Sequence, residues 1–346
     1  MTDAIIGIDL AKRVFQLHGA GPDGRVLFKL RLTRAKLIEF LAKTPPAIVA
    51  MEACGAAHFW ARTAAQSGHE VRIIPTQYVK AYVKRHKNDA ADAEAICEAA
   101  SRKTMRFVPV KSERQQSLQA VHRIRSRLIR NRTALVNEIR GLLAEFGLVF
   151  PYSIRALRSA LSVLLPEETD ELPELMRSLL RDLTQDLEFL DKKIEETNAR
   201  IEEINAETPL CQLLITIPGV GQLNASAFVA MIGDVNRFRR GRDLAAWLGL
   251  TPQQSSSGGK ERLGSISKKG NAYLRTILVH GARAYLWRVR RRKNQPRTLF
   301  EKWIVDKLAT RHTNVAIVAV ANRLARYLWA VMRTGQAFYS PPLRAA

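Results

Sequence analysis

The sequence predicts a chain of the α/β plus α class, in which an N-terminal α/β domain precedes helical regions. Short apolar runs alternate with amphipathic stretches over residues 1–110, and apolar residues at helical spacing dominate residues 111–207. The formal charge also changes along the 346 residues, from +7 over 1–110 to −2 over 111–207 and +18 over 208–346. This length suggests two or three domains, and we take these three ranges as the expected domains.

The first domain begins with three apolar runs that predict a meander of strands. Gly21-Pro22-Asp23-Gly24 is a turn signal between the second and third runs. Helices and strands then alternate, which is typical of an α/β sheet with a mixed edge. The expected strands are 4–10, 14–20, 26–32, 47–52 and 70–75. The expected helices are 34–43, capped by Thr33, 58–67, and 89–102, capped by Asn88 or Asp89.

The middle domain is expected to be helical, with one helix over 112–146. A later stretch has an apolar residue at alternating steps of four and three, which is a heptad seam with charged flanks. The seam consists of Leu183, Leu187, Leu190, Ile194, Thr197, Ile201 and Ile204. It predicts an antiparallel coiled coil or a dimerising coil, and a simple helical spacer is the alternative.

The third domain begins near Thr208 and is expected to be mainly helical. Residues 213–217, the turn PGVG at 218–221 and residues 225–232 have the pattern of a helix-hairpin-helix. There, Gly219 and Gly221 would let backbone N–H groups approach a phosphate. Residues 251–270 are rich in Ser, Gly and Lys and predict a long loop or two short strands. Further helices are expected over 241–248, 271–288, 299–310 and 313–333.

The net charge of +23 and the pI near 10.5 favour a polyanionic partner, and nucleic acid is the leading candidate. The sequence has no run of about 18 apolar residues and no basic secretory start, so we expect a cytoplasmic protein that joins the nucleoid when bound to DNA. Cys54, Cys97 and Cys211 form no CxxC pair. We expect all three to be small buried apolar residues rather than disulfide partners or zinc ligands.

Four carboxylates are candidates for a metal site. Asp9 and Glu52 end two predicted strands, and Asp89 and Asp92 begin a predicted helix three residues apart. Strand ends and helix starts gather at one edge of an open α/β sheet, where four carboxylates would repel one another without a cation. Two Mg²⁺ ions about 3.5–4 Å apart could clamp both oxygens of a phosphodiester displacement. The structural alternatives are a helix cap at Asp89 and solvent exposure at Glu52.

A serine-rich segment is the candidate source of a nucleophile. Ser255, Ser256 and Ser257 stand beside Gly258 and Gly259, and cations follow closely. A serine can attack a phosphate when it is positioned and its developing charge is compensated. A flexible linker is the structural alternative for this segment. The residues that we expect to contact nucleic acid are Arg123, Arg125, Arg127, Arg130, Gly219, Gly221, Lys260, Arg262, Lys268, Lys269, Arg290, Arg291 and Arg292.

Six separated motifs carry a resemblance that covers nearly the whole chain. They are GIDLAK (7–12), ME (51–52), KNDAADA (87–93), IPGVG (217–221), LAAWLGLTPQQSSSG (244–258) and ISKKGNAYLR (266–275). In this order the motifs resemble those of the bacterial insertion-sequence recombinases numbered one-ten, with their eleven-eleven subgroup. These are the DEDD transposases, also described as bridge-RNA-guided recombinases.

The resemblance implies an N-terminal RuvC-like domain with a ribonuclease-H fold, a coiled-coil region and a C-terminal transposase domain. It implies that Asp9, Glu52, Asp89 and Asp92 bind Mg²⁺, and that Ser257 is the nucleophile. Ser255 and Ser256 are the alternatives if the register shifts. It further implies a covalent phosphoserine, a strand junction, and a tetramer whose active sites combine domains of different protomers. A noncoding RNA from the element would pair with donor and target DNA.

The leading hypothesis is therefore an RNA-guided, site-specific DNA recombinase that acts as a homo-oligomer. Two alternatives remain. One is a RuvC-like junction resolvase that uses the four acids and water, which leaves the serine-rich segment unexplained. The other is a nonenzymatic nucleic-acid-binding protein, which leaves the complete acid set unexplained.

Overall fold

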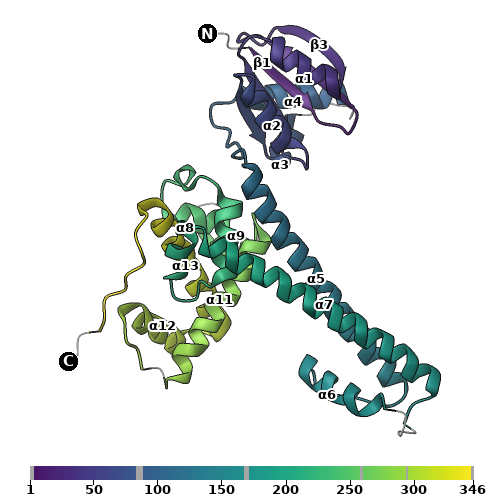
Figure 1. Ribbon diagram of the computed structural model, residues 1–346. Helices are drawn as coiled ribbons and strands as arrows, with labels where there is room; N and C mark the ends of the chain where they lie inside the picture. The colour runs from purple at the N-terminus through teal and green to yellow at the C-terminus, as the bar shows by residue number, and fades with distance from the viewer. Residues whose placement is uncertain (1–3, 83–88, 167–170, 258–259, 294, 344–346) are drawn as a thin grey trace. The chain divides into compact units, whose positions relative to one another are not determined.

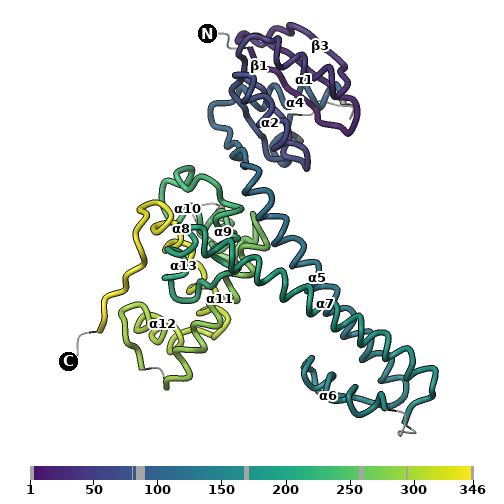
Figure 2. Tube along the Cα trace, viewed as in Figure 1, coloured from purple at the N-terminus to yellow at the C-terminus, as the bar shows by residue number. Residues whose placement is uncertain are grey.

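The computed structural model describes residues 4–82, 89–166, 171–257, 260–293 and 295–343, apart from the side chains of Lys80, Asp89, Ser257 and Lys260. The chain forms two compact units, residues 1–113 and 114–346 (Figures 1 and 2). This differs from the three expected domains, because helices of 111–207 share their packing with residues 208–346.

A five-stranded mixed sheet forms the centre of the first unit, with strand order β3-β2-β1-β4-β5. The first three strands are an antiparallel meander, and β4 and β5 continue parallel to β1. The strands are β1 (Ile5–Asp9), β2 (Val14–Ala20), β3 (Val26–Thr33), β4 (Ile48–Glu52) and β5 (Glu70–Ile74). The predicted α/β sheet with a mixed edge is confirmed.

Helices cover both faces of this sheet. On one face, α1 (Arg34–Lys43) and α2 (Ala57–Gln66) contribute to a core with Phe15 and Trp60 at its centre. On the other face, α4 (Asp89–Ala100) packs against β1, β2 and β4. Two short elements that the sequence did not predict, α3 (Thr76–Val79) and a 3₁₀ turn η1 (Lys80–Tyr82), come before α4.

The second unit begins with a helical arm of three helices, α5 (Glu113–Glu145), α6 (Ile154–Leu164) and α7 (Glu174–Ala206). Arg125 donates to Asn198 at 2.6 Å, and Arg132 donates to Asp191 at 3.0 Å. Moving seven residues forward in α5 thus means moving seven back in α7. The two helices therefore run antiparallel and side by side (Figures 1 and 2).

The heptad seam of α7 is buried within the chain. Leu187 lies in one apolar cluster with Leu135 and Ile139 of α5 and Leu157 of α6. Ile194 is also buried. The seam of α7 thus packs against helices of the same chain.

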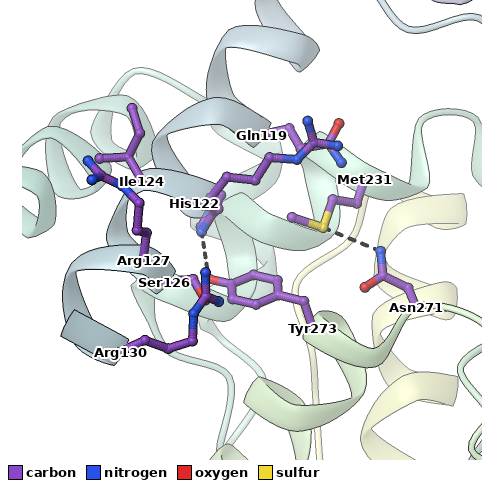
Figure 3. Close-up of a pocket in the computed structure, with 10 residues that line it drawn as sticks. Gln119, His122, Ile124, Ser126, Arg127, Arg130, Met231, Asn271 and Tyr273 are labelled. Carbon is purple, nitrogen blue, oxygen red and sulfur yellow. Dashed lines mark hydrogen bonds between the residues drawn. The ribbon is translucent and has the colours of Figure 1, made fainter. Parts of the chain in front are cut away.

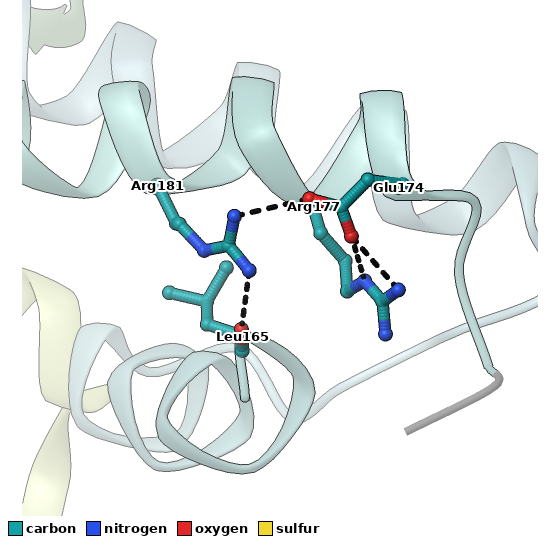
Figure 4. Close-up of polar contacts among 4 residues, drawn as sticks. All are labelled: Leu165, Glu174, Arg177 and Arg181. Atoms are coloured by element: carbon teal, nitrogen blue, oxygen red, sulfur yellow. Dashed lines mark hydrogen bonds and ion pairs between the residues drawn. The ribbon is translucent and has the colours of Figure 1, made fainter. Parts of the chain in front are cut away.

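Polar contacts fix the short helix α6 to the start of α7 (Figure 4). Arg181 donates to the carbonyl of Leu165, just beyond the end of α6, and to Glu174, both at 3.2 Å. Arg177 donates to the same carboxylate at 3.1 Å. The hydrogen bond from Arg181 is the largest cause of the lowered pKa of Glu174.

The rest of the second unit packs around one apolar core, which also includes Leu118 of α5. Its elements are α8 (Pro209–Ile215), α9 (Gln222–Ile232), a 3₁₀ turn η2 (Val235–Arg237), α10 (Gly241–Trp247), β6 (Pro252–Ser257), β7 (Lys260–Ile266), α11 (Ala272–Arg291), α12 (Leu299–Thr310) and α13 (Thr313–Thr334). The shared core is the physical reason why residues 111–207 do not form a separate unit.

Within the described residues, one helix, α13, is long and apolar enough to span a membrane by length and composition alone. Many of its apolar side chains, among them Val320, Leu324 and Leu328, are buried in the core of the second unit. It packs against α10 and α11 as a core helix does.

The cysteines are only partly as predicted. Cys97 and Cys211 are buried, and burial raises the pKa of each thiol to about 11. The expectation that Cys54 is buried was wrong. It lies two residues beyond the end of β4, in the connection to α2, where the sheet no longer covers it.

Candidate active site

Two neighbouring strands bring Asp9 and Glu52 to the same edge of the sheet. β1 and β4 are parallel, and their register pairs Ile8 with Met51. Asp9 and Glu52 are the next residues on these two strands, and both are half-buried. The carboxyl ends of the two strands therefore bring both acids to one edge of the sheet.

The alternation of the strands assigns both acids to one face. Ile5 and Ala50 belong to the buried cluster that includes residues of α4. Asp9 and Glu52 stand an even number of residues further along the same strands, and residues two apart share a face. Both acids therefore lie on the face that α4 covers.

A glycine lets α4 approach this face closely. A Cβ at Gly7 would lie 2.3 Å from the carbonyl oxygen of Ala93 and 2.7 Å from the amide nitrogen of Cys97. The thiol of Cys97 is also 3.5 Å from the carbonyl oxygen of Ile5. The C-terminal part of α4 thus lies over the start of β1, so its first turn lies toward Asp9.

That first turn carries the two remaining acids. Asp92 is half-buried, and the backbone of Asp89 begins α4 while its side chain is outside the described part of the structure. Among the described residues, no group of three or more Asp, Glu, His or Cys side chains surrounds a common point. The donor set still fits a divalent cation, because carboxylate oxygens are the ligands that Mg²⁺ and Mn²⁺ prefer.

The serine segment forms one strand of a two-stranded hairpin rather than a linker. β6 and β7 are antiparallel, and each serine has a charged partner across the ladder: Ser255 pairs with Arg262, Ser256 with Glu261 and Ser257 with Lys260. The side chain of Gln254 donates to Ser256 at 3.0 Å and to Glu261 at 3.4 Å. Ser256 therefore faces an acid, whereas the partners of the other two serines are cations.

The base of the hairpin is fixed to the core. The guanidinium of Arg275 donates to the carbonyls of Leu248 and Lys269, each at 2.9 Å. Asn322 of α13 donates to the carbonyl of Leu250 at 3.1 Å. These bonds attach the residues before β6 and after β7 to α11 and α13, so the base of the hairpin has a fixed position.

Comparison with known proteins identifies the family. A model of the DEDD transposases of IS110 elements matches residues 6–148, and the model described as "Transposase IS116/IS110/IS902 family" matches residues 211–297. A protein of Pseudomonas aeruginosa named "Probable family 20 transposase" is 49% identical over 94% of this chain and 96% of its own length. This chain belongs to the IS110 family of transposases. The expected family is thereby confirmed.

Two further relatives of this transposase are named after their insertion sequences. The transposase for IS1111A of Coxiella burnetii is 42% identical over 95% of this chain and 89% of its own length. The transposase for IS1328 of Yersinia enterocolitica is 41% identical over 96% of this chain and 98% of its own length. The chain is therefore a DNA strand-transfer enzyme, and DNA is its substrate.

The arginines of α5 point in two directions in the transposase. Arg125 is bonded to Asn198 of α7, so it ties the arm together. Arg123, Arg127 and Arg130 follow at steps of four and three and share another face of the helix. In the described parts of the chain, none of these three makes an ion pair. They stay available for an anionic ligand.

The two glycines of the predicted helix-hairpin-helix differ in their surroundings. Gly219 has a φ of +86°, and a Cβ there would lie 3.0 Å from the carbonyl oxygen of Gly281 and 3.1 Å from Tyr285. Its conformation therefore serves close packing against α11. Gly221 precedes α9, and no atom lies within 4 Å of its Cβ position, so only this glycine leaves room for a phosphate.

Among the remaining expected contacts, Arg292 is engaged inside the protein. It pairs with the buried Glu301, which also accepts from the hydroxyl of Tyr285 at 2.9 Å and from the amide of Arg297 at 2.7 Å. Burial raises the pKa of Glu301, but these hydrogen bonds outweigh it and the pKa is lowered. The exposed cations of this group are Arg262, Lys268, Lys269, Arg290 and Arg291.

A pocket of about 560 Å³ opens between α5, α9 and the start of α11 (Figure 3). We call it the arginine pocket. It is lined by Gln119, His122, Arg123, Ile124, Ser126, Arg127, Arg130, Met231, Asn271 and Tyr273. The sequence had singled out its arginines only. The spacing along α5 could have revealed one wall. Asn271 and Tyr273 stand in the motif at 266–275, but no local pattern places that motif beside α5.

One hydrogen bond joins two walls of the arginine pocket. The Nδ1 of His122 and the hydroxyl of Tyr273 lie 3.1 Å apart, and His122 is fully buried. Burial lowers the pKa of His122 to about 4, with the positive charge of Arg125 as a smaller cause. The imidazole is therefore neutral at pH 7, and the positive charge of the pocket comes from its arginines.

Proposed function

We propose that this transposase is an RNA-guided, site-specific DNA recombinase that joins strands through a phosphoserine at Ser257, with a divalent-metal site at Asp9, Glu52, Asp89 and Asp92. The close packing of α4 on Gly7 carries the proposal for the acids, because it directs the first turn of that helix toward the end of β1. The strand order of the first unit supports a RuvC-like, ribonuclease-H type of domain.

The chemistry that we propose conserves phosphodiester bonds. The hydroxyl oxygen of Ser257 bonds to phosphorus, one bridging P–O bond breaks, and the leaving strand departs as a free hydroxyl with the serine proton. A strand hydroxyl then attacks the phosphoserine and releases the serine. Mg²⁺ held by the acids would supply positive charge to the phosphate oxygens during both steps.

The hairpin register supports Ser257 over Ser256. Ser256 faces Glu261, which would repel a phosphate, whereas Ser257 is paired with Lys260. Arg262 on the same strand adds a second cation near the attacked phosphate. Ser255 is also paired with a cation, so it remains the alternative nucleophile.

The partners that we propose are donor DNA, target DNA and a noncoding bridge RNA from the element. The net charge of +23 supports a partner with many phosphates, and exposed cations occur on α5, on the hairpin and on α11. We place the protein in the bacterial cytoplasm, at the nucleoid when it is bound to DNA. We further propose that it acts as a homodimer that assembles into a tetramer.

A denaturing gel tests the catalytic proposal. Purified protein is incubated with end-labelled donor and target DNA, Mg²⁺ and a transcript of the noncoding DNA that flanks the gene. A covalent protein–DNA adduct is expected, and it should depend on the transcript. Ser257→Ala should lose the adduct and keep DNA binding, whereas Ser256→Ala should keep both. Asp92→Asn should lose strand transfer while its circular dichroism spectrum stays unchanged.

Each other outcome has a defined meaning. Free nicked DNA without an adduct in the unaltered protein would indicate hydrolysis by water, as in a junction resolvase. A phosphoserine mapped to position 255 would move the assignment. An adduct that persists when all three serines are alanine would remove this hairpin from the chemistry.

A further inference from the structure

We infer that the arginine pocket binds one unpaired nucleotide of a nucleic-acid strand, with its phosphate on the arginines and its base against the apolar wall. The inference rests on nucleic acid being the partner in the proposed function. It goes beyond that function because it assigns an extruded nucleotide to a defined pocket rather than a backbone to a basic surface.

The charge of the pocket selects a phosphate. Arg123, Arg127 and Arg130 line one wall, and the side chains that line the pocket include no carboxylate. The guanidinium of Arg130 donates to the hydroxyl of Ser126 at 3.2 Å, which positions it at this wall. Planar guanidinium groups are well suited to phosphate oxygens.

Apolar and aromatic side chains of the lining select a base. Ile124 stands on α5 beside the arginines, whereas Met231 and Tyr273 come from α9 and α11. Ile124 and Met231 supply apolar surface, and Tyr273 supplies an aromatic ring (Figure 3). The bond from Tyr273 to His122 fixes the position of that ring. Nucleobases stack on aromatic side chains, with a gain of about 1–3 kcal/mol per base. An acidic peptide would use the arginines but would leave this wall without a partner.

The size and lining of the pocket fit one unpaired nucleotide better than a duplex. The volume of about 560 Å³ lies in the range of small-molecule sites, which is about 300–1,000 Å³. A duplex presents phosphates at its surface and keeps its bases stacked inside, so it could reach the arginines but not the apolar wall. A nucleotide that has left the stack can reach both.

The full-length protein and hairpin oligonucleotides test the inference. Each hairpin carries one unpaired 2-aminopurine or is fully paired at that position, and both are made as DNA and as RNA. We expect about tenfold tighter binding of the unpaired probe and a change of its 2-aminopurine fluorescence. The nucleic acid that shows the larger preference identifies the source of the nucleotide.

Variants of the protein distinguish binding in the pocket from general attraction by positive charge. Ile124→Trp fills the pocket without a change of charge, and Ile124 is 47% exposed, so the fold should tolerate it. It should remove the preference for the unpaired probe and leave binding of the paired probe within twofold. Ile124→Ser, which removes apolar surface at the same exposed position without a change of charge, should do the same if the tryptophan variant fails to fold. Arg283→Gln, an exposed charge loss on α11, should leave the preference intact.

Several results would overturn the inference: no preference for the unpaired probe in the unaltered protein, an equal loss for both probes in Ile124→Trp, or displacement by a polyglutamate peptide as readily as by the unpaired probe. The experiment reads binding and not strand transfer. A failure of the serine mechanism would therefore leave its result unchanged, and the two proposals can fail separately.

Discussion

The missing side chain at Gly7 sets the distance between β1 and α4. In Gly7→Ala, the new methyl would lie 2.3 Å from a backbone oxygen of α4, so the helix must move. We expect a loss of about 1–3 kcal/mol in the free energy of unfolding, measured by urea denaturation. Gly55→Ala is the control, because no atom lies within 4 Å of its Cβ position. Equal stability of the two variants would contradict this role of Gly7.

His122 makes the free energy of unfolding of the transposase depend on pH, and the direction of this dependence follows from its pKa. Burial lowers its pKa from 6.5 to about 4, so the unfolded chain takes up the proton first as the pH falls. The stabilisation of the folded state by neutral His122 is complete above pH 6.5. It declines as the pH falls toward 4 and is constant below pH 4. Between pH 7.5 and pH 5 this amounts to about 2 kcal/mol.

The variant His122→Gln removes this titration. The free energy of unfolding should fall between pH 7.5 and pH 5 in both proteins. In the variant this fall should be about 2 kcal/mol smaller than in the unaltered protein. Other titrating groups contribute equally to both proteins and cancel in the difference. Identical pH dependence would show that His122 does not stay neutral in the folded state.

Two glycines inside helices should respond to alanine with opposite signs. Gly141 in α5 is exposed and has no atom within 4 Å of its Cβ position, so Gly141→Ala should raise stability by roughly 0.5–1 kcal/mol through helix propensity. At Gly281 in α11, a Cβ would lie 2.1 Å from the carbonyl oxygen of Gly219. Gly281→Ala should therefore destabilise the protein, and thermal unfolding of both variants checks the pair.

Most elements could be predicted because their patterns are local. β2 at 14–20 and α1 at 34–43 lie at the predicted positions. Thr33 takes the N-cap position of α1, but its side chain makes no capping hydrogen bond. The hairpin was one of two expected forms of the serine segment. The helix α6 was missed because only Leu157, Leu161 and Leu164 are buried in it, and other helices of the arm provide their packing.

The candidate sites, like the elements, could be predicted where their signal is local and not where it depends on tertiary packing. The acids could be predicted because each stands at the end of a strand or the start of a helix. The arginine pocket could not, since His122 and Tyr273 are 151 residues apart and meet only through the packing of α5 on α11. The burial of the heptad seam inside one chain also depends on a second long helix that the seam itself does not specify.

The proposed oligomer needs a surface other than the seam. Leu175 and Leu179 of α7 are 73% and 47% exposed and stand one turn apart, so a second copy of the chain could cover them. Leu175→Lys with Leu179→Lys should shift the protein toward the monomer in light scattering. Gln185→Lys, at an exposed polar position of the same helix, should not. An unchanged mass for the double variant would exclude this surface.

The hairpin is thermodynamically almost separate from the rest of the second unit. The described residues 252–256 and 261–265 are exposed, and none belongs to the apolar core. Substitutions there should change the free energy of unfolding very little. Natural selection on β6 and β7 can therefore act through strand transfer with little interference from folding, so the hairpin is a segment where new reactivity or substrate preference can evolve without loss of the protein.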